Sequence, residues 1–144
     1  MTKVKKYGLV SLIINGISAL GGGVAFLYAR EAIKTMEWNG PDMSGYGEMS
    51  LLFLGLVGAA LMVVLMVPLV HLVLAGFNSL MMLLQVLTGK RGFSLLPIIS
   101  SALLVLMNGM FTLGGVFLFA PLVALPLVSI VLNIKSLEKS KEVE

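Results

Sequence analysis

The sequence predicts an all-α integral membrane protein with four transmembrane helices. Apolar residues make up 58% of the 144 residues, whereas charged residues make up only 12%. A soluble domain carries about twice that share of charged residues. The stretch from Met49 to Gly89 contains no Lys, Arg, Asp or Glu, although about 20 apolar residues already span a bilayer. This stretch is therefore expected to lie in the lipid bilayer.

Helices are expected rather than a β-barrel, because the apolar runs do not alternate with polar residues at period two. Every backbone polar group inside lipid must be paired within the protein, and a helix achieves this locally. We expect one membrane domain over residues 1–144. Its predicted segments are spans near 7–29, 51–75, 94–112 and 116–134, an outer loop over 30–50 and a cytoplasmic tail over 135–144.

The first span, 7–29, is expected to remain uncleaved because it is longer than a signal-peptide core and no A-x-A site follows it. Small or polar residues share one face of this span, at alternating steps of three and four. They are Gly8, Ser11, Asn15, Ser18, Gly22, Ala25 and Ala29. Small residues let helix backbones approach closely, so we expect this face to pack against another span of the chain. A homodimer or partner-binding face is the alternative.

The second apolar run determines the topology. As one helix, residues 51–88 would be about 57 Å long, which exceeds a hydrocarbon core of about 30 Å. A hairpin at Pro68 would place Lys90, Arg91 and the C-terminal lysines opposite the basic N-terminus, whereas a single span places them on the same side. Short loops rich in Lys and Arg stay cytoplasmic. The sequence therefore predicts a multi-pass plasma-membrane protein with both termini in the cytoplasm.

The second helix is expected to be long, or bent with an interfacial extension. Gly76 lies next to the turn-favouring Asn78 and Ser79, so a bend there would send residues 80–87 along the inner interface. The alternative is one tilted helix kinked at Pro68, because proline removes a backbone donor. The expected helix breaks are Pro68, Gly76, Pro121 and Pro126.

His71 is the only titratable side chain between Met49 and Gly89. We expect it to be a packed, hydrogen-bonding histidine; a proton or substrate contact and a haem or metal ligand are the alternatives. Together with Asn78 and Asn108 it forms the candidate polar site. Other intramembrane amides, such as Gln85 and Asn133, are expected to join helices.

The sequence contains no cysteine, no P-loop, no paired carboxylates within a span and no Ser-His-Asp set. We therefore expect no enzyme activity, no cofactor, no metal site and no binding of nucleic acid. The favoured function is a non-enzymatic accessory or interaction subunit in the lipid bilayer, associating with another membrane protein or with itself. The alternative is a small oligomeric transporter or channel with its site at the broken second and fourth helices.

The topology is testable by cysteine labelling, because the native chain has no cysteine. A cysteine replacing Ser44 should react with an impermeant thiol reagent in intact cells, and one replacing Ser140 should react only after permeabilisation. The reverse pattern would contradict a cytoplasmic location of the termini.

Overall fold

The computed structural model describes residues 3–35, 48–113 and 120–138. These ranges contain four long α-helices and one short 3-10 turn. They are α1 (Lys3–Thr35), α2 (Glu48–Thr88), η1 (Arg91–Ser94), α3 (Leu95–Leu113) and α4 (Ala120–Glu138). All four α-helices are long and apolar enough to cross a membrane, which confirms this part of the predicted fold class.

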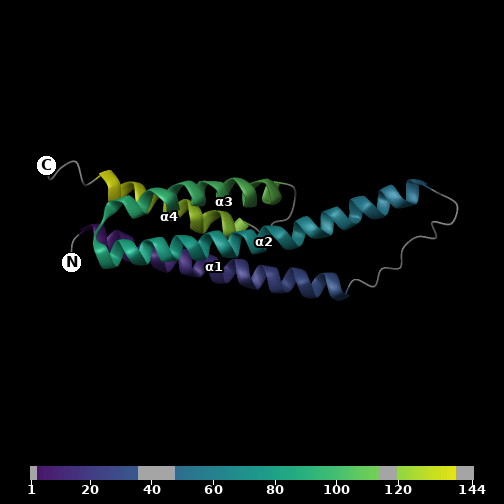
Figure 1. Ribbon diagram of the computed structural model, residues 1–144, viewed down its shortest axis with the longest axis horizontal. Helices are drawn as coiled ribbons and strands as arrows, with labels where there is room; N and C mark the ends of the chain where they lie inside the picture. The colour runs from purple at the N-terminus through teal and green to yellow at the C-terminus, as the bar shows by residue number, and fades with distance from the viewer. Residues whose placement is uncertain (1–2, 36–47, 114–119, 139–144) are drawn as a thin grey trace.

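The helices form a bundle in which α1 and α3 each pack against both α2 and α4. Successive helices run in opposite directions, so the start of α1, the α2–α3 connection and the end of α4 lie at the same end of the molecule (Figure 1). At the other end, α1 and α2 continue well past α3 and α4. The bundle is therefore four helices thick over only part of its length.

The second helix is continuous, and the expected break at Gly76 is wrong. Pro68 and Gly76 both lie inside the α-helix of 41 residues. Ser79 donates its hydroxyl to the carbonyl oxygen of Ala75 at 3.0 Å, a bond that is compatible with the helix. The expectation that residues 80–87 lie along the interface is also wrong, because Met82 and Gln85 are fully buried in the bundle.

The fourth helix is less interrupted than its two prolines suggested. Within the described ranges it begins at Ala120, so Pro121 lies in its first turn, where proline is tolerated. Pro126 remains inside the helix and is fully buried. The helix continues to Glu138, past the predicted boundary at residue 134. Residues 114–119, which include the predicted start of this span, lie outside the described residues.

Glycine ends α2 where the chain turns towards α3. Gly89 has a φ of 71°, a left-handed conformation that glycine adopts without steric cost. Its N–H donates to the carbonyl oxygen of Gln85 at 2.8 Å, which satisfies one of the carbonyl groups left open at a helix end. This turn allows η1 and α3 to fold back alongside α2.

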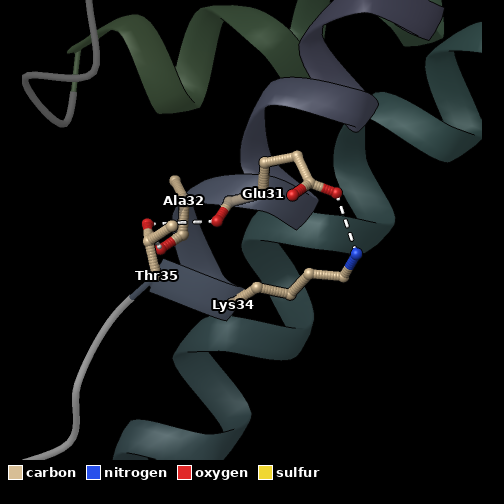
Figure 2. Close-up of polar contacts among 4 residues, drawn as sticks. All are labelled: Glu31, Ala32, Lys34 and Thr35. Atoms are coloured by element: carbon tan, nitrogen blue, oxygen red, sulfur yellow. Dashed lines mark hydrogen bonds and ion pairs between the residues drawn. The ribbon is translucent and has the colours of Figure 1, made fainter.

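The C-terminal end of α1, far from the chain termini, has a polar surface. Figure 2 shows Lys34 paired with Glu31 through an Nζ–Oε1 distance of 2.9 Å, and Thr35 bonded to the carbonyl oxygens of Glu31 and Ala32. The two charged side chains are more than half exposed, so this pair lies on the surface of the helix. The predicted outer loop, 30–50, is shorter at both ends than expected, because α1 continues to Thr35 and α2 begins at Glu48. Its remaining residues, 36–47, lie outside the described residues.

The small-residue face of α1 faces the other helices of its own chain. Gly8 lies against Gln85 and Val86, and Gly22 lies against His71 and Leu72. A Cβ atom at Gly22 would be 2.8 Å from His71 Cδ2 and 3.0 Å from the Leu72 backbone nitrogen. Only glycine therefore permits this approach between α1 and α2.

This close approach predicts that Gly22→Ala destabilises the bundle by about 1–3 kcal/mol through overpacking. Gly16→Ala is the matched control, since a Cβ there meets nothing within 4 Å and alanine favours a helix by up to about 1 kcal/mol over glycine. Unfolding of both variants in detergent micelles measures the difference. Equal stability of the two would show that α1 and α2 are not in tight contact at Gly22.

Candidate functional site

Polar side chains occupy the centre of the bundle. Among the described residues, twelve polar or charged side chains are buried, compared with five from hydrophobic core residues. The polar ones are Ser11, Asn15, Ser18, His71, Asn78, Gln85, Ser94, Ser101, Asn108, Ser129, Asn133 and Ser136. Large apolar side chains lie instead on the outer surface, such as Leu20 at 72% exposure and Leu106 at 67%. This distribution is the reverse of that in a soluble protein.

The buried polar residues recur every seven positions. On α2 they are His71, Asn78 and Gln85; from η1 into α3 they are Ser94, Ser101 and Asn108; on α4 they include Ser129 and Ser136. Between them lie buried apolar residues, among which are Ala75, Met82 and Leu104. A seven-residue repeat keeps the same positions facing the partner helices. Successive polar layers are therefore about 10.5 Å apart along the helix, and an apolar layer lies between each pair.

The Gln85 layer (Gln85, Ser94 and Ser136) lies nearest the end that carries both termini. Gln85 Nε2 donates to Ser136 Oγ at 3.0 Å, and Ser94 Oγ donates to Gln85 Oε1 at 2.7 Å. Both ends of the amide are therefore bonded, and one side chain joins α2, η1 and α4. This amide therefore forms a direct hydrogen bond between α2 and α4, which lie at opposite corners of the bundle.

The Asn78 layer (Asn78, Ser100 and Ser101) joins α2 to α3. Asn78 Nδ2 donates to Ser101 Oγ at 3.1 Å, and Ser100 Oγ donates to Asn78 Oδ1. Asn78 is therefore a partner of two serines that the sequence analysis did not single out. It is one layer away from His71 and Asn108, with which the sequence had grouped it.

A separate polar cluster joins α1 to α4 and consists of Ser11, Asn15, Ser129 and Asn133. Asn15 Nδ2 donates to Ser129 Oγ at 2.9 Å, and the Ser11 and Ser129 hydroxyls are 3.2 Å apart. Asn133 Nδ2 donates to Ser129 Oγ at 3.3 Å. The contacts of Asn15 and Ser11 with Ser129 cross from α1 to α4 and fix the register between these helices.

The His71 layer (Ser18, His71 and Asn108) joins α1, α2 and α3. His71 Nε2 lies 2.9 Å from Ser18 Oγ, and His71 Nδ1 lies 2.9 Å from Asn108 Nδ2. Asn108 Nδ2 also donates to the Leu104 carbonyl oxygen at 2.8 Å. Both amide hydrogens are then used, so Nδ1 accepts and the neutral ring donates from Nε2 to Ser18. Asn108 Oδ1 is buried and has no hydrogen-bond partner among the described residues.

An apolar cluster follows the His71 layer towards the extended end of α1 and α2. Val67 and Leu122 form its buried centre, with Ala25, Met107 and Phe111 packed around them. The polar layers therefore occupy the half of the bundle nearest the termini, and apolar packing closes the other half.

The layers offer little room for a cofactor or a metal. Each ring nitrogen of His71 already has a partner, so a metal would have to displace one of them. No group of three His, Cys, Asp or Glu side chains gathers within the described ranges. A hollow of about 380 Å³ lies between α1 and α4 and is lined by apolar residues such as Gly21, Ala25 and Leu122. It includes none of the buried polar side chains.

The predicted helix-break residues do not come together around one site. Pro121 lines the hollow between α1 and α4. Pro68 and Pro126 are buried inside their helices, and a Cβ atom at Gly76 would meet nothing within 4 Å. The structure therefore does not assemble Pro68, Gly76, Pro121 and Pro126 into a common cavity.

No family model, curated protein or solved structure matches this chain. The function is therefore inferred from the geometry of its own residues. The members of the layers that the sequence analysis missed are Ser94, Ser100, Ser101, Ser129 and Ser136. Most of these serines lie seven residues from another buried polar residue of the same segment, as His71, Asn78 and Gln85 do. This spacing was the signal in the sequence that would have identified them.

The Gln85 layer yields a stability prediction. Gln85→Leu should cost about 1–3 kcal/mol, because it leaves the buried hydroxyls of Ser94 and Ser136 without their partner. The triple variant Gln85→Leu, Ser94→Ala, Ser136→Ala should recover most of that loss, since it removes the unpaired groups as well. Thermal unfolding in micelles tests this, with the exposed Thr88→Ala as the control. If the triple variant is less stable than Gln85→Leu, the three side chains do not act as one unit.

Proposed function

We propose that this chain is a multi-pass protein of the plasma membrane, with both termini cytoplasmic, and that it acts as a non-enzymatic interaction subunit. The observation that carries this proposal is the apolar length of α2, which exceeds what a bilayer covers. The excess length offers an uncharged helical surface to another membrane protein or to a second copy of the chain.

The lengths of the helices define this excess. The 19 residues of α3 and of α4 correspond to about 29 Å, which matches a hydrocarbon core of about 30 Å. The apolar part of α2, Leu52–Thr88, has 37 residues and a length of about 56 Å. Even at a tilt of about 40°, the upper end of the usual range, it would rise about 43 Å. About 13 Å of this apolar helix therefore extends beyond the hydrocarbon core and requires an apolar partner other than the lipid chains.

The excess lies in the apolar arm, which we define as residues 52–66 of α2. Figure 1 shows this part of α2 beyond the ends of α3 and α4. None of its residues is buried, and Leu52, Leu56 and Met62 are each about two-thirds exposed. The arm contains no charged residue. An exposed apolar surface of this kind is typical of an interaction site, and its partner is expected to be apolar too.

The orientation is supported by the distribution of basic residues. Lys5, Lys6, Lys90 and Lys135 belong to the end of the bundle that carries both termini, whereas Arg30 and Lys34 belong to the far end of α1. Short segments rich in Lys and Arg remain cytoplasmic. The end with the termini and the polar layers is therefore assigned to the cytoplasmic side.

The core favours interaction over transport. Buried Ala75 and Met82 on α2, with Leu104 on α3, separate the polar layers from one another. The apolar cluster around Val67 and Leu122 closes the bundle beyond His71. Selective pathways are lined by rings of carbonyl groups or charged side chains, and the described residues of a single chain supply only isolated, uncharged polar layers.

Photo-crosslinking in native membranes tests the proposal. A photoreactive amino acid replacing Leu56 should form discrete crosslinked species, because the apolar arm is covered by a partner. Ile99 on α3 is the matched control, since it has the same 68% exposure but lies on a helix of bilayer length. A species of twice 15.3 kDa would identify a second copy, and a species of any other mass above 15.3 kDa would identify another protein.

Two results would contradict the proposed function. Equal crosslinking from Leu56 and Ile99 would mean that the apolar arm is not a preferred contact. Ion or solute flux through liposomes that contain only this protein would favour the transporter alternative instead.

A further inference from the structure

We propose that the end of the bundle that carries both termini binds the anionic headgroup of a phospholipid. The binding surface, which we call the basic surface, consists of Lys5 and Lys6 of α1 and Lys90 in the α2–α3 turn. The inference rests on the membrane location in the proposed function, but it does not require that the apolar arm has a partner.

The α2–α3 turn brings together lysines from two distant parts of the sequence. A Cβ atom at Gly89 would be 3.6 Å from Lys5 Cε, so the end of the Lys5 side chain lies over this glycine. Lys90 is the next residue of the turn, and its N–H donates to Thr88 Oγ1 at 3.2 Å. The Lys6 and Lys90 side chains are exposed, and Lys5 is half-buried. Cationic groups from α1 and from the turn therefore occupy neighbouring positions on one surface.

The basic surface has little acidic charge around it. Within the described ranges, Glu138 at the end of α4 is the single acidic residue of this end of the bundle (Figure 1). It lies three residues after Lys135 on the same helix, and residues at this spacing are neighbours on a helix surface. Glu31 and Glu48 belong to the opposite end of the molecule. A surface lined by charges of one sign attracts a ligand of the other sign, so the expected ligand is an anion.

The convergence of the lysines points to one bound group rather than to orientation alone. Lys and Arg orient a membrane protein through the side of the membrane on which they lie, and this effect does not require Lys5 to lie beside Lys90. A phosphate group can accept from two ammonium groups at once, and such charge-assisted hydrogen bonds are the stronger ones. The pair of lysines at the turn has the composition of a phosphate-binding surface.

Apolar side chains beside the lysines indicate that the anion is part of a lipid. Leu9, Leu87 and Leu95 are large, exposed apolar residues, and each lies within five residues of a lysine of the basic surface along the chain. A free phosphate ion would contact only the charged groups. A phospholipid places its phosphate at the lysines and its acyl chains along the apolar helix surface, and clusters of basic residues next to a membrane helix are typical binding sites for anionic lipids.

Native mass spectrometry of the full-length protein in micelles tests the proposal. The probes are phosphatidylglycerol, whose headgroup carries a net negative charge, and zwitterionic phosphatidylcholine with the same acyl chains. The parent protein should bind phosphatidylglycerol more tightly. Lys5→Gln combined with Lys90→Gln should weaken this binding by about 30-fold, since each lysine near an anionic lipid contributes about 1 kcal/mol, and should leave phosphatidylcholine binding unchanged.

The matched control is Arg30→Gln combined with Lys34→Gln. It also removes two exposed positive charges, but from the far end of α1. This variant should bind phosphatidylglycerol as tightly as the parent protein. An equal loss of affinity in the two double variants would show that total charge, and not the basic surface, attracts the lipid, and would overturn the proposal.

Two measurements on the parent protein keep the proposal falsifiable if the Lys5 and Lys90 variant fails to fold. Raising the ammonium acetate concentration from about 0.1 M to about 1 M shortens the Debye length from about 10 Å to about 3 Å, and the preference for phosphatidylglycerol should decrease. Glycerol phosphate, which has no acyl chains, should not displace the lipid at equal concentration. Equal binding of the two lipids, a preference that salt leaves unchanged, or displacement by glycerol phosphate would each overturn the proposal, whatever the crosslinking result at Leu56.

Discussion

The buried polar side chains must find their hydrogen-bond partners inside the protein, and this constraint organises the whole bundle. The outer surfaces of the helices are apolar; in the proposed membrane location, a Gln or Asn turned outward would lose its bonds at a cost of a few kcal/mol. In lipid, apolar side chains gain little by leaving their surroundings, and helices associate through close packing and polar contacts. The layers and the close contact at Gly22 supply these two contributions.

The features that depend on one helix alone could be predicted from the sequence. The four helices follow from the lengths of the charge-free runs, and the packing face of α1 follows from its repeat of small and polar residues. Each of these patterns is complete within a single segment. They needed no knowledge of which helix lies next to which.

The prediction was wrong where a local preference was overruled by a contact with another helix. Asn78 and Ser79 favour turns in isolation, so a bend near Gly76 was expected. In the structure Asn78 bonds to Ser101 on α3 and Ser79 bonds to its own helix, and α2 continues without a break. The pairing of Gln85 with Ser136 could not be predicted from the sequence either, because residue spacing identifies the buried face of a helix but not which helix packs against that face.

The two halves of α2 differ in what they contribute. From Val67 onward its buried positions take part in the bundle, and their polar groups are bonded to neighbouring helices. The apolar arm, residues 52–66, contains no buried side chain. The bundle therefore does not need the arm for its own hydrogen bonding, and the arm is available for contacts with other molecules without disturbing the layers.

The chemical differences among His71, Asn78 and Gln85 fix how α2 is aligned along its neighbouring helices. If α2 slid by seven residues along its neighbours, polar groups would again face polar groups, because the repeat is the same. The shorter Asn78 would then stand where Gln85 now reaches from α2 to Ser136 on α4. An imidazole would take the position of the Asn78 amide between two serines. Neither replacement reproduces the bonds of the original, so the sequence distinguishes the correct alignment from its nearest repeat.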